Sequence, residues 1–189
     1  MGTLGLTNVE PSVVDLQDLD KFSDNQFDIV TCCYGYMFAE DKVKALSETF
    51  RVLKPGGSLI ATTWDELDLL RICDEIMTAV LKEKPPPPTL NPMSLSEPGL
   101  FRSILLQAGF QGENIQSTQS TYPFDFGVDP EFQYKVGTLI IKDKLDELEA
   151  HDVARKTFSS LINRYSSIEA DGSRTVPNNT FALTVARKN

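Results

Sequence analysis

Cysteine and histidine are scarce in this sequence. Its 189 residues include three cysteines, Cys32, Cys33 and Cys73, and one histidine, His151. An odd number of cysteines, two of them adjacent, does not form a disulfide framework, so we expect a reducing compartment, the cytoplasm. A single histidine leaves no Cys/His cluster with zinc-ligand spacing, so we expect no metal. The simplest interpretation is two buried thiols and one solvated imidazole.

Positive charge is also in short supply. Lysine and arginine number 18 against 27 acidic residues, a net charge of −9 with a pI near 4.6. Such a field repels phosphate backbones and anionic lipids, which argues against nucleic acid or a membrane surface as the partner. Apolar runs such as Ile104–Leu106 are far too short to span a bilayer. Met1–Glu10 lacks the basic and apolar regions of a signal peptide.

Several catalytic motifs are missing as well. The sequence contains no G-x-S-x-G elbow, no Walker A loop, no H-E-x-x-H helix and no G-x-G-x-x-G loop. These absences remove the usual signals of serine hydrolases, P-loop nucleotidases, zinc proteases and dinucleotide enzymes. What remains is the pattern of strands, helices and turns in a chain that is 41% hydrophobic, long enough to bury one sizeable core.

The first half of the chain predicts a βαβ unit. Phe27–Cys33 is a β-prone run without a turn residue, typical of a strand buried on both faces of a parallel sheet. Asp41–Leu53 has apolar residues at helical spacing, and Pro55-Gly56-Gly57 ends that helix. Ser58–Trp64 is the next strand, so a right-handed crossover between parallel strands is expected. A short strand, Asn8–Leu16, precedes the unit.

The remainder predicts a helical sub-lobe before a last strand, in an α/β fold. We divide residues 1–189 into cofactor-side βα units (1–84), a connector, strand and helical lobe (85–170), and a terminal strand (171–189). The expected elements are a helix over Glu66–Lys84, a polyproline connector at Pro85–Pro88, a helix from its cap Ser96 to Ala108 with Gly109 closing it, a strand over Ile115–Phe126, helices over Pro130–Ile141 and Lys144–Tyr165, a turn at Asp171-Gly172 and a strand over Thr180–Ala186.

Ligands of open α/β sheets bind beyond the carboxyl ends of the strands. The candidate site residues are therefore Asp15 and Leu16, then Cys32 to Tyr36, then Thr63 to Asp65. Spacing alone gives these positions no chemical role.

Four segments, in this order, resemble the class I S-adenosylmethionine-dependent methyltransferases, and in particular the small-molecule branch that includes the ubiquinone/menaquinone-biosynthesis methyltransferases. The resemblance implies a Rossmann-like methyltransferase sheet, S-adenosylmethionine as the cofactor, and a small-molecule acceptor. The segments are Phe27–Gly35 with Ala45-Leu46, Arg51–Leu59 (RVLKPGGSL), Leu95–Pro98 with Leu105–Phe110 (LLQAGF), and Gly172–Pro177 with Phe181–Arg187.

One part of the family pattern is absent. The family opens with a strand and a glycine-rich loop that holds the methionine end of the cofactor, and its second strand ends in an acid that binds the ribose. Gly5–Glu10 resembles the turn into the family's third strand. We therefore expect an N-terminally truncated sheet lacking its first two βα units, on the order of 60 residues. A natural short form and a gene-model artefact both remain open.

Site roles follow only where positions match. The resemblance implies that Asp15 accepts a hydrogen bond from the adenine amino group, that the Leu16 backbone meets the ring, and that Cys32, Cys33 and Tyr34 line the cofactor cleft. Tyr36 and Trp64 are substrate-side candidates. Each has a structural alternative: a turn cap for Asp15, and core or strand packing for the others. Asp28, Arg51, Lys54 and Pro55-Gly56-Gly57 are interpreted as scaffold.

Three functions are weighed. In the first, the parent protein is a cytosolic methyltransferase and this chain is its C-terminal portion, inactive alone. In the second, it is a non-catalytic binding protein on a degenerate methyltransferase scaffold. A nicotinamide-dependent oxidoreductase is the weakest, since its fingerprint loop is missing too. Aromatic residues in 122–134 favour a lipophilic or aromatic acceptor, although a small core explains them equally. An uncovered sheet edge predicts self-association.

Overall fold

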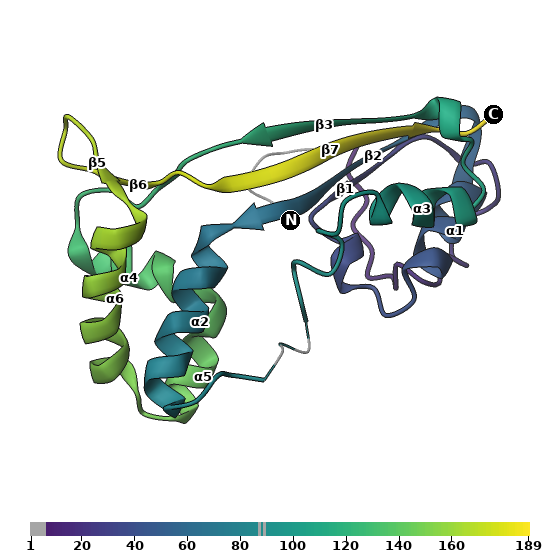
Figure 1. Cartoon of the computed structure of the whole chain (residues 1–189). Helices are drawn as coiled ribbons and strands as arrows, with labels where there is room; N and C mark the ends of the chain where they lie inside the picture. The colour runs from purple at the N-terminus through teal and green to yellow at the C-terminus, as the bar shows by residue number, and fades with distance from the viewer. Residues whose placement is uncertain (1–6, 87, 89) are drawn as a thin grey trace.

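The computed structural model describes residues 7–86, 88 and 90–189, which form a long twisted sheet with helices at both ends of one side (Figure 1). None of the helices in these ranges is long and apolar enough to cross a membrane. The elements are β1 (Phe27–Cys33), η1 (Tyr36–Phe38), α1 (Lys42–Val52), β2 (Leu53–Leu67), α2 (Asp68–Leu81), α3 (Leu100–Gln107), η2 (Gly112–Asn114), β3 (Ile115–Thr121), β4 (Phe124–Asp125), α4 (Pro130–Gly137), η3 (Leu139–Ile141), α5 (Lys142–Glu147), α6 (His151–Tyr165), β5 (Ser167–Ile168), β6 (Arg174–Val176) and β7 (Asn179–Arg187).

The main sheet has the order β1-β2-β7-β3. β1 and β2 are parallel, with Val30 opposite Leu59, as the βαβ pattern predicts. β7 lies antiparallel between β2 and β3, so that Ala186 is opposite Leu59 on one side and Ile115 on the other. A second sheet of three short strands, β4-β6-β5, lies in the helical lobe. The fold is a mixed α/β, Rossmann-like sheet with a helical lobe, which confirms the predicted class.

The βαβ unit forms where the sequence places it. The Asp41 carboxylate caps α1 by accepting a hydrogen bond from the Lys44 N–H at 2.8 Å. α1 then ends at Val52, before Pro55-Gly56-Gly57. Gly56 lies near the start of β2 and has a φ of +80°, a conformation that residues with a Cβ rarely adopt. The sequence therefore predicts both ends of this helix to within about a residue.

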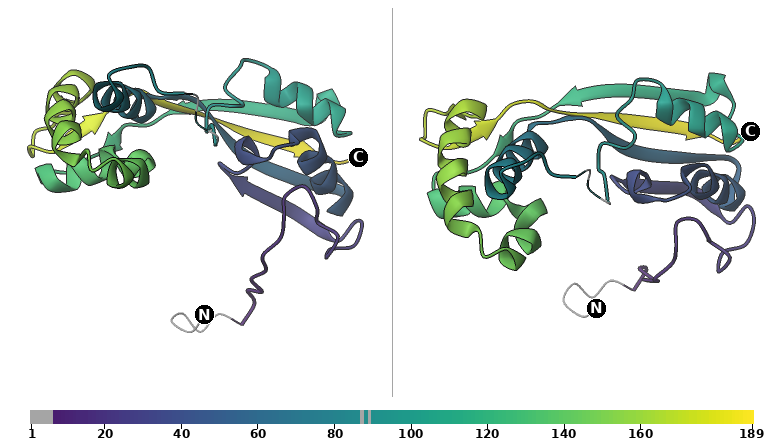
Figure 2. Two further views of the ribbon diagram at one scale, coloured as in Figure 1. Left: turned by 90° about the horizontal axis from the view of Figure 1, so that it is seen from below. Right: turned by 60° about the horizontal axis from the view of Figure 1, so that its bottom comes forward.

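Two hydrophobic cores divide the molecule. The first lies between one face of the sheet and the helices α1 and α3, and contains Leu46, Leu59 and Leu105. The second lies among α2, α4, α5, α6, β4 and β6, and contains Ile76, Leu145 and Phe126. Both views in Figure 2 show the helical lobe at the far end of the sheet from α1 and α3. α2 packs in the second core, although the sequence groups it with the first βα units (residues 1–84).

The segment before β1 is not the strand that the sequence predicts. Residues 9–14 have no regular structure, and Asp15 makes only an isolated bridge with Asp18. Val9 and Val13 are exposed, so the apolar residues of this segment find no sheet to cover. Figure 2 shows the segment leaving the body of the molecule. A strand cannot form without a partner for its backbone, and β1 does not supply one here.

β1 itself is buried on one face and not on two. Val30 and Cys32 pack against the first core, whereas Ile29 is 59% exposed and Thr31 and Cys33 are also exposed. The prediction of a strand buried on both faces is therefore wrong for this structure. One face of Phe27–Cys33 is uncovered instead. Uncovered apolar surface on a strand is a site where another chain or segment can bind.

Helix boundaries in the second half also differ from the predictions. α3 begins at Leu100 after Gly99, whose φ is +81°, and the hydroxyl of Ser96 instead bonds to the Met93 carbonyl. The pattern over Lys144–Tyr165 breaks into α5 and α6, because Glu149 adopts a φ of 50°. The strand over Ile115–Phe126 is divided into β3 and β4, which belong to different sheets. The predicted connector Pro85–Pro88 includes residue 87, which lies outside the described residues.

Candidate functional site

The carboxyl end of β1 is held in an unusual backbone conformation at Tyr34. Its φ is 52°, in the left-handed region that few residues other than glycine adopt. Its N–H points to both the carbonyl and the hydroxyl of Thr62 on β2, at 3.2 and 3.1 Å. Strained residues of this kind gather at functional sites, held by the structure around them. Here the neighbouring strand holds Tyr34.

Aromatic rings continue from Tyr34 across the sheet. The Tyr34 ring stacks on Trp64 of β2 with centroids 4.2 Å apart and planes at 9°. Phe181 of β7 meets both rings edge-on, at 6.2 and 6.4 Å. Phe124 also packs edge-on against Trp64, with ring centroids 5.9 Å apart. Two of the predicted residues, Tyr34 and Trp64, therefore form one aromatic wall at the end of β1 and β2.

Cys32 and Leu16 meet beside the same strand end. A Cβ added to Gly35 would lie 2.5 Å from the Cys32 sulfur and 3.8 Å from a Leu16 methyl carbon, so both side chains lie close to Gly35. Burial raises the pKa of the Cys32 thiol, while Cys33 is exposed on the other face of the strand. Leu16, Cys32 and Tyr34 therefore lie near one end of β1, whereas Cys33, also predicted to line the cleft, is exposed and does not line the groove described next.

An apolar groove of about 280 Å³ runs from this point along β1. Because Phe27–Cys33 pairs with β2 alone among the described strands, the groove lies beside an open sheet edge. Its lining is aliphatic and aromatic, which suits the flat or apolar part of a ligand and not its charged part. The lining residues are Leu16, Leu19, Phe22, Phe27, Ile29, Val30, Thr31, Cys32, Tyr36, Thr49 and Val52.

Asp15 lies outside the groove. Its carboxylate is exposed and accepts a hydrogen bond from the Gln17 N–H at 2.8 Å, the geometry of a turn cap. It borders a separate open depression of about 780 Å³, which Gln17 and three further acids, Asp18, Glu40 and Asp41, also line. The Gln17 side chain in turn accepts from the Asp41 N–H at 2.6 Å, which ties this loop to the start of α1.

Tyr36 is placed apart from the other predicted residues. Its side chain is 1% exposed, and its hydroxyl lies 2.6 Å from the Thr49 hydroxyl. Because the Thr49 hydroxyl donates to the Ala45 carbonyl, Tyr36 is the donor of the pair. Burial raises the pKa of Tyr36 far above its ordinary value. In this structure the residue packs the first core and orders α1.

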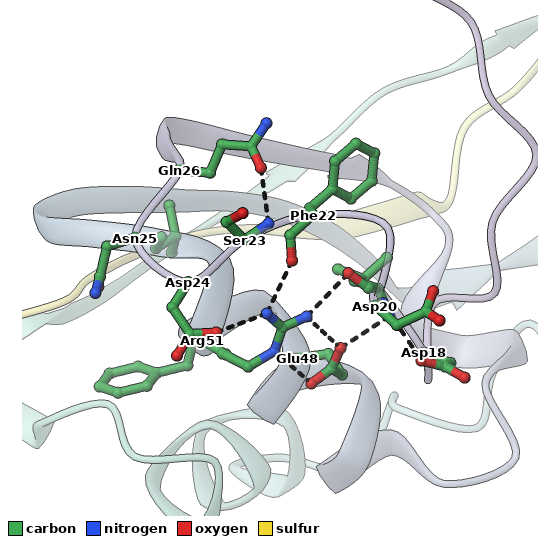
Figure 3. Close-up of polar contacts among 12 residues, drawn as sticks. Asp18, Asp20, Phe22, Ser23, Asp24, Asn25, Gln26, Glu48 and Arg51 are labelled. Carbon is green, nitrogen blue, oxygen red and sulfur yellow. Dashed lines mark hydrogen bonds and ion pairs between the residues drawn. The ribbon is translucent and has the colours of Figure 1, made fainter.

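Arg51 fastens the segment before β1 to α1 (Figure 3). Its guanidinium donates to the carbonyls of Leu19 and Phe22, both at 2.9 Å, and to the carboxylates of Asp24 and Glu48, at 2.8 Å. Glu48 also accepts from the Leu19 N–H, and its bonds to Arg51 lower the pKa of its carboxyl to about 2. The expectation that Arg51 is scaffold agrees with this network, which holds Leu19 and Phe22 beside the groove.

A second polar chain was missed by sequence reasoning. His151, expected to be a solvated helix residue, accepts or donates at both ring nitrogens: Nδ1 lies 2.8 Å from the Tyr134 hydroxyl and Nε2 lies 2.7 Å from Asp146. The three residues are 5 to 17 positions apart in the sequence and carry no spacing signal. Within the ranges that the structure covers, no group of three His, Cys, Asp or Glu residues has metal-binding geometry.

Comparison with known proteins finds similarity to methyltransferases over the first third of the chain. Residues 4–61 match the methyltransferase domain family model. The chain is 38% identical over 60 residues to the ubiquinone/menaquinone biosynthesis C-methyltransferase UbiE of Hydrogenovibrio crunogenus, a match that covers 32% of this chain and 23% of that protein. It is 45% identical over 47 residues to the demethylmenaquinone methyltransferase of Lactiplantibacillus plantarum, covering 25% of this chain and 20% of that protein. The match thus spans less than a quarter of either relative.

Solved structures share the fold over nearly the whole chain. The YcgJ protein from Bacillus subtilis aligns with a TM-score of 0.51 at 21% identity, covering 92% of this chain and 68% of that one. A protein from Bacillus halodurans C-125 aligns with a TM-score of 0.50 at 19% identity, covering 93% and 69%. Residues 4–61, which include β1, α1 and most of β2, are therefore similar to the methyltransferase domain, and the whole chain shares a Rossmann-like fold with these two solved structures.

Proposed function

We propose that the protein transfers a methyl group from S-adenosylmethionine, the cofactor of its family, to a small-molecule acceptor. The observation that carries this proposal is the meeting of Leu16, Cys32 and Tyr34 at the carboxyl end of β1, in a chain whose residues 4–61 match the methyltransferase domain. Ligands of open α/β sheets bind at this end of the strands.

The residues present fit one part of the cofactor. The apolar groove beside Leu16 and Cys32 suits the flat adenine ring, and the exposed Asp15 carboxylate accepts a hydrogen bond from an amino group without offering a competing donor. Nothing in the printed sequence supplies a G-x-G-x-x-G loop for the methionine end. We therefore propose catalysis for these residues only when they are joined to such a loop, and weak cofactor binding by the chain alone.

The chain's part in methyl transfer is positional. The bound cofactor supplies an already activated methyl group, so the protein has to align the acceptor with it and exclude water. The Tyr34–Trp64 wall limits where an acceptor can lie, and Leu16 and Cys32 keep water from the buried side of β1. Among the described residues we assign no side chain as a catalytic base.

Calorimetry tests the cofactor proposal. We expect no measurable heat of binding when micromolar chain is titrated with S-adenosylmethionine or S-adenosylhomocysteine. Low-micromolar affinity would contradict the proposal that the loop is required. Restoring a βα unit with a glycine-rich loop in front of residue 1 is expected to produce affinity, which Gly35→Leu, by overlapping Cys32, then abolishes. A loop-bearing protein that binds equally well with Gly35→Leu would show that the site lies elsewhere.

The acceptor is proposed to be lipophilic or aromatic. Tyr122, which is 59% exposed, stacks on Phe181 with centroids 5.8 Å apart, so rings extend from Trp64 towards the helical lobe. Trp64 is the only tryptophan in the sequence, and its fluorescence therefore reports on this wall alone. A flat aromatic such as 1-naphthol is expected to quench it, and cyclohexanol less. Equal quenching by both would remove the preference.

The second candidate is a non-catalytic binding protein that keeps the scaffold. The open edge of β1 and the 59% exposure of Ile29 favour it, since such an edge invites pairing with another copy. The coding sequence upstream of Met1 separates the two candidates. An in-frame strand and Gly-x-Gly loop supports the enzyme, and a stop codon supports the binding protein. Sedimentation of the wild-type chain and Ile29→Lys tests self-association, which the charge is expected to reduce.

A further inference from the structure

A cleft of about 330 Å³ in the helical lobe has no place in the proposed methyl transfer. It is lined by residues of α4, α6 and β6, elements of the helical lobe that Figure 1 shows at the opposite end of the sheet from α1 and α3. Its floor is apolar, formed by Pro130, Tyr134, Phe158 and Ile162. Two arginines, Arg155 and Arg174, stand in its wall. A volume of this size is enough for a small organic molecule.

The two arginines differ in how their charge is balanced. Arg155 is neutralised: its guanidinium makes a bidentate pair with Glu131, at 2.5 and 3.0 Å, and lies over the Tyr134 ring at 4.2 Å. Arg174 bonds only to neutral oxygens, the Ser166 hydroxyl at 3.1 Å and the Asn163 amide at 2.7 Å. Among the described residues it has no carboxylate within ion-pair distance.

The Arg174 side chain is therefore held in place by neutral hydrogen-bond partners, and its positive charge is not balanced by a carboxylate of the described residues. Two of its five N–H groups are used, which fixes the plane of the guanidinium and leaves the other donors for a ligand. The charged lining is Glu131, Arg155 and Arg174, a net charge of +1 (−1 + 2) in a molecule whose net charge is −9. The other clefts described near Asp15 and Asp74 have acidic or balanced linings.

We propose that this cleft binds a small organic anion whose carboxylate pairs with Arg174 and whose apolar body covers Phe158 and Ile162. A guanidinium matches a planar carboxylate with two parallel hydrogen bonds, and the partly buried position reduces competition from water. The apolar floor selects against inorganic anions, which gain nothing from it. Tyr134 does not compete for the ligand, because its hydroxyl is bonded to His151.

Calorimetry or saturation-transfer NMR tests the proposal with three probes: benzoate, hexanoate and inorganic phosphate, with benzamide as the neutral isostere of benzoate. We expect benzoate and hexanoate to bind, and benzamide and phosphate to bind at least about tenfold more weakly. Arg174→Gln is expected to lower the affinity for benzoate by about the same factor. Arg187→Gln is the matched control: it changes the net charge equally but lies at the far end of β7.

A second variant covers the case in which Arg174→Gln fails to fold. Ser159 is an exposed residue of α6 on the rim of the cleft, so Ser159→Phe fills the space while leaving Arg174 intact. It is expected to abolish benzoate binding without altering circular dichroism. Binding of benzamide equal to benzoate, or benzoate binding that survives both Arg174→Gln and Ser159→Phe, would overturn the proposal. No binding of either carboxylate at 10 mM would also overturn the proposal, because a dissociation constant above about 10 mM corresponds to less binding free energy than one charged hydrogen-bonded pair should give.

Discussion

The two cores differ in how completely they are covered. In the second core, Ile76, Phe126, Leu145, Ala154 and Val176 are all fully buried, and helices or strands surround them on every side. The first core is one-sided: α1 and α3 cover one face of the sheet, while Ile29, Leu183 and Val185 remain exposed on the other. A closed core needs no partner, whereas an open sheet offers surface to one.

β2 and β7 join the two cores, because both strands run from the sheet into the helical lobe. At the join, Leu67 pairs with Asn179, and the Asp68 N–H donates to the Asn178 carbonyl at 3.1 Å. Asn179 is fully buried, and its amide donates to the Val176 carbonyl at 2.7 Å. These strands link the two cores, and Trp64 of β2 packs against both of them.

The largest effects are expected from core truncations. Leu59→Ala in the first core and Ile76→Ala in the second each remove a fully buried side chain, with an expected loss of about 2–5 kcal/mol. We expect Leu59→Ala to loosen the whole chain, because Leu59 lies on a shared strand, and Ile76→Ala to loosen the helical lobe alone. Hydrogen exchange should show faster exchange in 130–165 for Ile76→Ala with 53–63 unchanged. Equal exchange across both regions would mean a single cooperative unit.

A smaller effect is expected at the segment before β1. Arg51→Met removes four partners at once and is expected to cost about 1–3 kcal/mol and to release residues 16–24. Lys54→Met is the control: its partner Asp28 is 80% exposed, so its loss is expected to cost under about 0.5 kcal/mol. Urea unfolding of both variants, with limited proteolysis of the N-terminal segment, measures the difference. Equal costs would contradict the role assigned to Arg51.

The same network gives a pH dependence. The folded pKa of Glu48 is about 2, below its ordinary 4.5, because Arg51 favours the ionised form. Its contribution to stability is therefore complete above about pH 5 and is lost as the pH falls towards 2. The stability gap between wild type and Arg51→Met should narrow between pH 6 and pH 3. A gap that stays constant over this range would show that Glu48 contributes little.

The elements of the first core were easier to predict from the sequence than those of the second, because they depend on signals between residues that are close in the sequence. α1 and β2 follow from local signals: a cap at Asp41, helical spacing, and a proline–glycine stop. β1 was placed correctly, but its burial depends on what lies beside it, and a sequence pattern cannot show a missing neighbour. In the helical lobe, Tyr134, Asp146 and His151 meet through tertiary packing, so no spacing rule finds them. Cys32 and Tyr34 lie at the end of β1, where the strand pattern places them, whereas Leu16 lies beside them without the strand that the sequence predicts before it.

The smallest effect on stability is expected at the three thiols, whose reactivity directly compares how open the two cores are. Cys33 is exposed on the uncovered face, Cys32 is half-buried beside the groove, and Cys73 is buried in the second core with its thiol donating to the Gly137 carbonyl at 3.4 Å. Burial raises the pKa of Cys73 to about 12.

Since the thiolate is the reactive form, we expect a disulfide reagent at pH 8 to modify Cys33 first, Cys32 more slowly, and Cys73 only on unfolding. Cys33→Ser should remove the fast phase and change the free energy of unfolding by less than about 0.5 kcal/mol. Rapid modification of Cys73 in the folded chain would show that the second core opens as readily as the first, and the contrast between them would fail.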